Sequence, residues 1–403
     1  MPHPDPLLQE KLTQAFAAME AHDLDAWLIF GQEEPHGSDP IYPLLMGNRE
    51  AGGFYLLVRP GLHNGRGRAI AIVNGLDEML PRSTGIWNEV VVHTGDSWQA
   101  LKDTLSDVNP RTIGINYSQA YASVDGLTHG RYRNLMEAFA NHPYKNRFVS
   151  AEALAFALRT RKTAQEIAAI RAAIAQTDVV FERLRAFLHT GLSGLEIFNF
   201  IQTQAVSLGC GFGWSAYNDP ILTLGPVAFM GHTPPPEGLT LEPGNLLQID
   251  LGLRCNGYCS DFQRMFYVPR PGEAAPPAPV QALFDLVHNG ITCMIAAIRP
   301  GAPNHLPASI AFPQLTAAGF PEPKYSAGHQ LGRGVHDGGV GLLHFRHPRE
   351  GAVMEVGNVF TVEGLETRLE GHGWMSLEED VVVTEHGCEV LTNRQNELWL
   401  VEE

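Results

Sequence analysis

Apolar and polar residues along the first 155 positions alternate between helical and strand-like spacing. An amphipathic run covers residues 7–21, and short apolar runs follow at 26–30, 54–58, 69–73, 90–92 and 113–117. Such alternation is typical of an α/β domain. No glycine-rich phosphate loop follows any of these strands, so the pattern does not favour a nucleotide site.

The pattern changes near residue 160. Thr163 and Glu166 have the spacing of a capping box, which satisfies free amide groups at the start of a helix. Apolar residues then recur at helical spacing up to residue 188, without proline, and Gly191 provides a stop. We therefore expect two domains, an amino-terminal α/β domain over residues 1–157 and a second domain over residues 158–403.

A second break follows within the carboxy-terminal half. Residues 269–279 are rich in Pro, Gly and Ala and should form an exposed loop, and residues 280–298 again have a helical pattern. The residues able to carry chemistry lie on either side of this break.

Charge and composition exclude some classes of partner. Lys and Arg number 28 against 44 Asp and Glu, which gives a net charge of −16. This charge disfavours nucleic acid and anionic membrane surfaces. We read no secretory signal and no apolar run of membrane-spanning length, and we expect a cytoplasmic protein.

The segment 246–268 predicts a hairpin that carries two aspartates. Two apolar runs flank Asn256-Gly257, a strong signal for a two-residue turn. With these two residues as the loop, Asp250 faces Gln263 and Asp261 faces Gly252. The two carboxylates then share one sheet face, a costly arrangement without a cation between them. The alternative is that both lie on a solvated face.

The five cysteines suggest reduced thiols. Their odd number and scattered positions do not suit a disulfide framework. The hairpin register places Cys255 and Cys259 on opposite faces, so a bond or a shared metal between them is not expected.

Further candidate ligands follow the helix at 280–298. His329 and His336 lie in a glycine-rich segment, Glu363 ends an apolar run, and Glu378 precedes another. Each feature alone has an ordinary explanation, such as a surface histidine or an acidic strand edge. Together, four carboxylates and one imidazole form an oxygen-rich donor set that suits two divalent ions of the manganese, cobalt or iron type.

The order and spacing of these residues resemble the pita-bread metallopeptidases: Xaa-Pro dipeptidase (prolidase), aminopeptidase P and methionine aminopeptidase. The resemblance covers about residues 160–403. It is carried by Asp250-Leu-Gly, Ser260-Asp261, Gly328-His329, Val335-His336-Asp337, Thr361-Val-Glu363 and Leu377-Glu378. It implies an α+β pita-bread (creatinase/aminopeptidase-like) catalytic domain behind a creatinase-like amino-terminal α/β domain.

The resemblance also implies roles for individual residues. Asp250 would bind one ion, His329 and Glu363 the other, and Asp261 and Glu378 both. Glu363 would also be the general base. His336 and His232 would contact the substrate and assist proton transfer. Glu378 is preferred over Glu379 as the ligand because it lies six residues before Thr384 in the sequence. The alternation of side chains along a strand then turns Glu379 away from the metal ions.

Three positions depart from the family pattern. Glu363-Gly-Leu stands where Glu-Pro-Gly is usual, and Ser376 stands where an arginine is common. A substrate-binding arginine would then come from elsewhere, with Arg368 preferred over Arg333 and Arg346. Tyr217 only loosely matches a tyrosine that often precedes the motif around His232.

The resulting hypothesis is a hydrolase of Xaa-Pro bonds, foremost of dipeptides, that acts through a hydroxide bridging two metal ions. We expect manganese, with cobalt, zinc or iron as alternatives, small proline-containing peptides as substrates, and a homodimer. The alternatives are an Xaa-Pro aminopeptidase on longer peptides, a non-peptide amide hydrolase and a non-catalytic binding paralogue.

Overall fold

A computed structural model describes residues 4–33, 39–62, 65–226, 233–343 and 352–402. The chain forms two compact units, Met1–Gln165 and Glu166–Glu403. The boundary expected after residue 157 falls inside helix α6 (Glu152–Thr160). The buried Leu154 and Leu158 of this helix pack in the same core as α1 (Pro6–Ala21), so α6 lies in the first unit.

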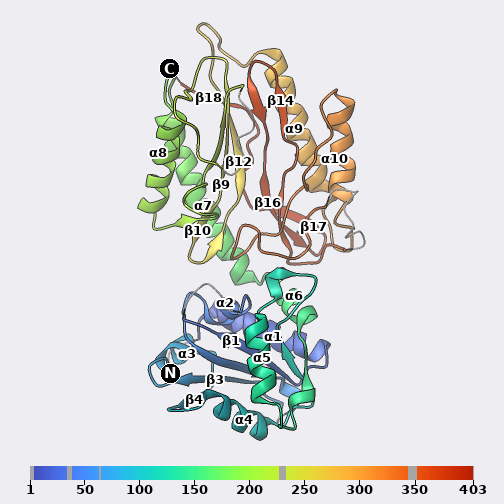
Figure 1. Ribbon diagram of the computed structural model, residues 1–403. Coiled ribbons are helices and arrows are strands. Elements are labelled where there is room, and N and C mark those ends of the chain that lie inside the picture. The colour runs from blue at the N-terminus through green and yellow to red at the C-terminus, as the bar shows by residue number, and fades with distance from the viewer. Residues whose placement is uncertain (1–3, 34–38, 63–64, 227–232, 344–351, 403) are drawn as a thin grey trace. The chain divides into compact units, whose positions relative to one another are not determined.

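The first unit is built around a six-stranded mixed sheet in the order β4-β3-β2-β1-β5-β6 (Figure 1). The predicted alternation of helices and strands is present. Its strands are β1 (Ala26–Gly31), β2 (Gly53–Val58), β3 (Arg68–Asn74), β4 (Glu89–His93), β5 (Ile113–Ile115) and β6 (Phe148–Ser150). Its other helices are α2 (Tyr42–Met46), α3 (Met79–Thr84), α4 (Ser97–Val108) and α5 (His129–Ala138).

Both faces of this sheet are covered. Along β1, Trp27 and Ile29 point into one apolar core, and Leu28 and Phe30 point into a second one on the other face. Because successive strand residues alternate between faces, a continuous apolar run is what a sheet buried on both sides requires.

The second unit begins in α7 (Ala164–Phe187), the helix expected after Thr163. Its other helices are α8 (Gly194–Ser207), α9 (Ala278–Ala297) and α10 (Leu306–Ala317). Its strands are β7 (Gly211–Phe212), β8 (Ile221–Leu224), β9 (Leu246–Leu251), β10 (Leu253–Cys255), β11 (Tyr258–Cys259), β12 (Phe262–Tyr267), β13 (Val359–Val362), β14 (Thr367–Leu369), β15 (Gly373–Met375), β16 (Glu379–Thr384), β17 (Gly387–Val390) and β18 (Trp399–Leu400).

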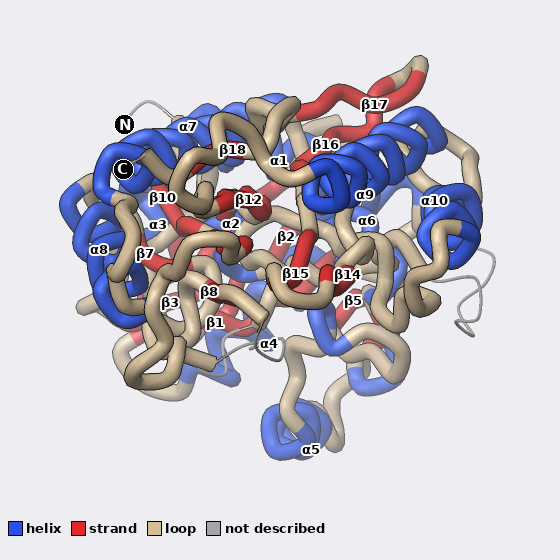
Figure 2. The backbone as a smooth tube through the Cα atoms, turned by 90° about the horizontal axis from the view of Figure 1, so that it is seen from above, coloured by secondary structure: helices blue, strands red, loops and turns tan. Residues whose placement is uncertain are grey.

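These strands form two main sheets, β18-β12-β9-β8 and β13-β16-β17. In Figure 1 the strands lie between α7 and α8 on one side and α9 and α10 on the other. Helices α9 and α10 pack against each other, and Figure 2 shows them as neighbours. Their buried faces, including Phe284, Ile291 and Phe312, join Phe360 and Val381 of the strands in one core.

Helix α9 is long and apolar enough to cross a membrane by length and composition alone. The hydropathy pattern had predicted no run of membrane-spanning length. Its buried residues, such as Val287 and Met294, belong to the core of the second unit. A core helix meets the same length and composition test, so this feature is weak evidence for a membrane span.

The hairpin register agrees with the prediction. Asp250 pairs with Gln263 and Cys255 with Tyr258. The turn residues Asn256 and Gly257 both have positive φ, at 53° and 85°, as a two-residue turn of the primed type requires. This register sets both aspartates on the same side of the sheet.

The expectation of five reduced thiols is wrong in the structure. Cys210 and Cys255 form a disulfide, and Cys259, Cys293 and Cys388 are free. The partner of Cys255 lies 45 residues upstream and not across the hairpin. It is brought there by the pairing of β7 with β10, which joins Phe212 to Leu253 and Gly211 to Arg254.

Candidate metal centre

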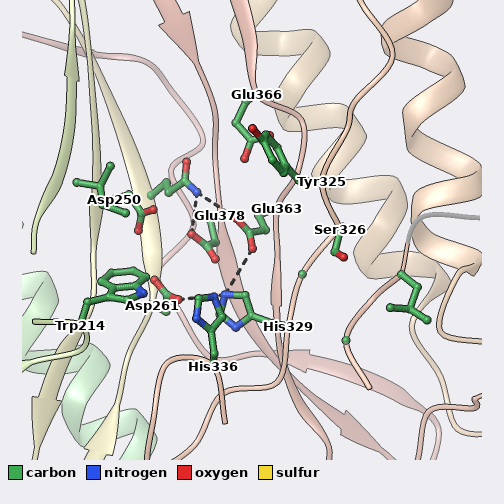
Figure 3. Close-up of a pocket in the computed structure, with 15 residues that line it drawn as sticks. Trp214, Asp250, Asp261, Tyr325, Ser326, His329, His336, Glu363, Glu366 and Glu378 are labelled. Carbon is green, nitrogen blue, oxygen red and sulfur yellow. Dashed lines mark hydrogen bonds and ion pairs between the residues drawn. The ribbon is translucent and has the colours of Figure 1, made fainter. Parts of the chain in front are cut away.

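Strand ends converge on one cavity in the second unit. Asp250 lies on β9, Asp261 directly precedes β12, Glu363 directly follows β13, and Glu378 directly precedes β16. All four line a cavity of about 640 Å³ together with His329 (Figure 3). The structure therefore brings together the five residues that the sequence singled out as candidate ligands.

His329 lies at the centre of this group. Its Nε2 is 3.4 Å from Oδ2 of Asp261 and 3.5 Å from Oε1 of Glu363. One ligand atom each of Asp261, His329 and Glu378 lies within 4.8 Å of the other two. Burial, and then the nearby His336, lower the pKa of His329 to about 3. The imidazole is therefore neutral and has a lone pair for a metal ion.

Two glycines make the placement of these ligands possible. Gly328, before His329, has φ +147°, and a Cβ there would collide with the carbonyl oxygen of Thr361. Gly364, after Glu363, has φ +87°, a value that the proline ring does not allow. The turn after Glu363 therefore differs in its backbone from one that contains proline at this position.

Two of the four carboxylates are buried and two are half-buried, and the described lining of the cavity holds no lysine or arginine beside them. Asp261 and Glu378 are each 1% exposed. Burial raises the pKa of Asp250 to about 7 and raises the pKa values of Asp261, Glu363 and Glu378 well above their ordinary range, with the neighbouring carboxylates adding to the last three. Such a cluster costs free energy unless a positive charge enters it.

Several ligand atoms also lack hydrogen-bond partners. Among the described residues, no hydrogen bond is made to Oδ1 of Asp250, to Oδ1 of Asp261 or to Oε1 of Glu378. Buried polar atoms of this kind normally have a partner. Oxygen donors without partners, converging with an imidazole in one cavity, fit divalent metal ions.

A hydrogen-bonded layer holds the ligands from behind. The Gln263 amide donates to Oε2 of Glu378 at 2.9 Å and to Oε2 of Glu363 at 3.4 Å, and it accepts a bond from Gln248. Buried Arg264 donates to the carbonyl oxygens of Gln263 and Glu378. The sequence pattern did not identify Gln263 as part of the site, although its predicted pairing with Asp250 places both side chains on the same face of the sheet.

Glu379 points away from the cavity. It is buried and forms an ion pair with Arg264 at 3.1 Å and a hydrogen bond with Thr392. Glu378, one residue earlier, lines the cavity. The alternation of side chains along the strand, used above to separate the two acids, agrees with this placement.

The substrate-binding candidates have different positions. His336 lines the cavity, with its ring centroid 4.1 Å from that of His329. His232 and Arg346 lie outside the described residues. Arg368 is exposed, donates to the carbonyl oxygen of Pro226, and is not among the described residues that line the cavity. Arg333 lies over the ring of Tyr258, and it too is absent from the described lining.

The described lining includes residues that the sequence did not single out. Trp214 faces His336, with ring centroids 6.4 Å apart, and the amides of Gly213 and Trp214 bond to buried Asp219. Glu366, Tyr325 and Ser326 also line the cavity. The sequence pattern could not predict that these residues line the cavity. They lie in turns and loops, where side-chain directions follow no simple period.

Comparisons with known proteins give the family. Residues 168–385, more than half of the chain, match metallopeptidase family M24. An uncharacterized peptidase, YqhT of Bacillus subtilis, is 25% identical over 316 residues, which are 78% of this chain and 82% of that relative.

Solved structures agree in fold. An Xaa-Pro dipeptidase from Bacillus anthracis has a TM-score of 0.75 at 22% identity, covering 98% of this chain and 99% of its own. An X-Pro aminopeptidase from Thermotoga maritima has a TM-score of 0.76 at 23% identity, with 96% and 100% covered. Because the family match spans most of the second unit, the chain belongs to metallopeptidase family M24, and the predicted pita-bread fold and peptidase class are confirmed.

Proposed function

We propose that this peptidase binds two divalent ions in the cavity and hydrolyses the bond between a residue and a following proline. The observation that carries the proposal is the convergence of four carboxylates, each buried or half-buried, and one neutral imidazole in a cavity whose described lining holds no lysine or arginine. The Xaa-Pro specificity is supported by the solved relatives with this fold, which are an Xaa-Pro dipeptidase and an X-Pro aminopeptidase.

We assign each proposed ligand to one or both ions. Asp250 would hold one ion, His329 and Glu363 the other, and Asp261 and Glu378 would reach both. When bound, the ions would polarise the scissile carbonyl group and lower the pKa of a water molecule between them. We propose manganese, because the donor set is mostly hard oxygen.

Glu363 is the proposed general base. Its carboxylate lies among the other ligands, and Thr361 donates a hydrogen bond to Oε1 at 3.4 Å. It would take a proton from the attacking water as the new C–O bond forms at the carbonyl carbon. The C–N bond then breaks, and the proton passes to the proline nitrogen.

His336 is the proposed substrate contact. Its ring lies between Trp214 and His329 and lines the cavity. From there it would donate a hydrogen bond to the carbonyl oxygen as negative charge develops on it. His232 is proposed to assist proton transfer at the same site.

Substrate length separates two candidate activities. The resemblance to prolidases favours dipeptides, whose carboxylate needs a cation. The described lining contains no lysine or arginine, which favours longer peptides cleaved as by an aminopeptidase. Rates on Ala-Pro and Ala-Pro-Ala, measured with manganese-loaded protein, decide between them, and Ala-Ala-Ala serves as a control. Cleavage of the control at the same rate as Ala-Pro-Ala would contradict specificity for proline.

Two further proposals concern the protein in the cell. A homodimer is implied by the prolidase resemblance, and light scattering on the purified chain tests it. We also propose a cytoplasmic location. Fractionation of cells that produce the protein tests it, and recovery of the protein outside the cytoplasmic fraction would contradict it.

A further inference from the structure

Glu366 introduces an acid into the cavity that the proposed metal site does not use. It lies in the turn between β13 and β14, three residues after Glu363, and lines the same cavity. The pairing of β14 with β15 joins Arg368 to Trp374 and Thr367 to Met375. One step further in this register, Glu366 lies opposite Ser376.

The position opposite Glu366 supplies no charge. Ser376 is fully buried, and its hydroxyl oxygen has no hydrogen-bond partner among the described residues. Figure 3 draws Glu366 beside Tyr325 at one end of the cavity and Trp214 at the other. Glu366 is therefore directed into the space that a substrate would occupy.

The carboxylate of Glu366 lacks a partner within the described part of the chain. It makes no ion pair there, and the only hydrogen bond recorded for it comes from its own backbone amide. Burial raises the pKa of Glu366, and its charge in turn raises the pKa values of Asp250 and Glu363. By contrast, buried Glu379 has both Arg264 and Thr392.

The missing partner can come from the substrate. In a peptide with a free amino end, the α-ammonium group is on the carbon bonded to the scissile carbonyl carbon. When that carbonyl lies at the proposed ligands Asp250 and Glu363, the ammonium group lies beside them. Glu366 is a further carboxylate that lines the same cavity as these two ligands.

We propose that Glu366 binds the α-ammonium group of the substrate's first residue and so restricts cleavage to peptides with a free amino end next to the scissile bond. This inference rests on the proposed function and names the group that selects the substrate. A charge-assisted hydrogen bond in a partly buried site is strong enough to change kcat/KM by roughly 10- to 100-fold.

The test compares two substrates that differ only in the amine. Ala-Pro-Ala and propionyl-Pro-Ala are given to the manganese-loaded protein and to E366Q, with metal content measured for each. We expect the wild type to prefer Ala-Pro-Ala, and E366Q to lose roughly tenfold or more of that preference through a higher KM. Propionyl-Pro-Ala should be cleaved by E366Q at least as well as by the wild type.

Matched variants separate this role from a structural one. E370Q removes an exposed acid four residues away and should keep the wild-type preference. E366D should restore part of the preference for the amine. An equal loss on both substrates, an unchanged preference in E366Q, or a loss of bound metal would overturn the proposal.

Failure of the proposed function would be recognised separately. If the wild type hydrolyses no Xaa-Pro peptide, calorimetry of the same two peptides with the metal-loaded protein still tests Glu366. Tighter binding of Ala-Pro-Ala that is lost in E366Q would support its role, and equal binding of both peptides would overturn it.

Discussion

Two buried carboxylates, one in each unit, have opposite surroundings. In the first unit, Asp25 is fully buried, and Arg59 and Arg111 contact it at 2.6 and 3.0 Å. In the second unit, Asp261 is equally buried and is surrounded by Asp250, Asp380 and Glu363. The chain neutralises Asp25 with its own arginines and leaves the acids that line the cavity with Asp261 without a cation in the described lining, as expected if metal ions complete that site.

The pKa values express this difference. Burial raises the pKa of Asp25, but the hydrogen bonds and charge of Arg111, with Arg59, outweigh it, so the pKa is lowered. Burial and like charges both raise the pKa of Asp261. One carboxylate is therefore held ionised by the chain, and the other needs a proton or a metal ion.

The largest expected effect is on activity. E378Q removes one of the carboxylates proposed to reach both ions, so the chemistry they supply, worth several kcal/mol, is lost. We expect kcat/KM on Ala-Pro-Ala to fall by roughly 1,000-fold or more. E385Q, which changes an exposed acid at the other end of the same strand, should retain full activity. Comparable rates for the two variants would show that Glu378 has no such role.

Metal removal should destabilise the second unit and spare the first. Ligand binding at a concentration roughly 1,000-fold above Kd stabilises the folded state by about 4 kcal/mol. Calorimetry with manganese and with a chelator should therefore shift the unfolding of the second unit. Equal melting temperatures under both conditions would contradict the proposed metal site.

The same measurement has a predicted dependence on pH. The pKa of Asp250 in the folded, metal-free protein is raised to about 7, above its value in the unfolded chain. A group of this kind favours the folded state at low pH and loses that contribution as pH rises through the folded pKa. The stabilisation by manganese should therefore be larger at roughly pH 8 than at roughly pH 6, and the opposite trend would argue against these carboxylates as ligands.

A smaller effect is expected from Gln263, which positions Glu378 and Glu363. Q263L removes both amide hydrogen bonds, and loss of such supporting contacts typically lowers metal affinity by about 10- to 100-fold. Manganese titration should show weaker binding with the number of bound ions unchanged. Q263E is a second variant for the same test. It adds a carboxylate that repels Glu363 and Glu378, and it should bind manganese no more tightly than Q263L. Unchanged affinity in both variants would remove Gln263 from the site.

The smallest effect is expected in the first unit. D25N weakens the contacts with Arg59 and Arg111 and should destabilise this unit by about 2 kcal/mol, the scale of a hydrogen bond to a charged group. Metal content and kcat should not change. E137Q, which alters an exposed acid of α5, should leave stability within about 0.5 kcal/mol of wild type. A loss of bound metal in D25N would contradict the prediction that this substitution affects only the first unit.

The stability lost in D25N should also depend on pH. Because the folded pKa of Asp25 is depressed, its contribution is present above the unfolded pKa and disappears as pH falls through the folded value. Wild type and D25N should therefore converge in acid, the reverse of the trend at the metal site.

The sequence correctly predicted the features that depend on the alternation of side chains along a strand or on the type of a turn. The Asn256-Gly257 turn determined the hairpin register and with it the shared face of Asp250 and Asp261. Strand alternation separated Glu378 from Glu379. In each case the side-chain direction depends on a few neighbouring residues.

Other features depend on contacts between distant segments. Cys210 meets Cys255 because β7 pairs with β10, and no pattern near either cysteine reveals that pairing. The direction of Glu366 depends on the turn that follows Glu363, where Gly364 has a left-handed backbone. Arg368 on strand β14 is exposed and donates to the carbonyl oxygen of Pro226, and its contact with a substrate stays a prediction.

We propose above all that metal ions occupy the cavity lined by Asp250, Asp261, His329, Glu363 and Glu378. Anomalous diffraction at the manganese edge, from crystals of the full chain grown with manganese, tests it most directly. We expect two peaks in this cavity, with oxygen atoms of Asp261 and Glu378 in contact with both. Density without a peak there, or peaks confined to other parts of the protein, would contradict it.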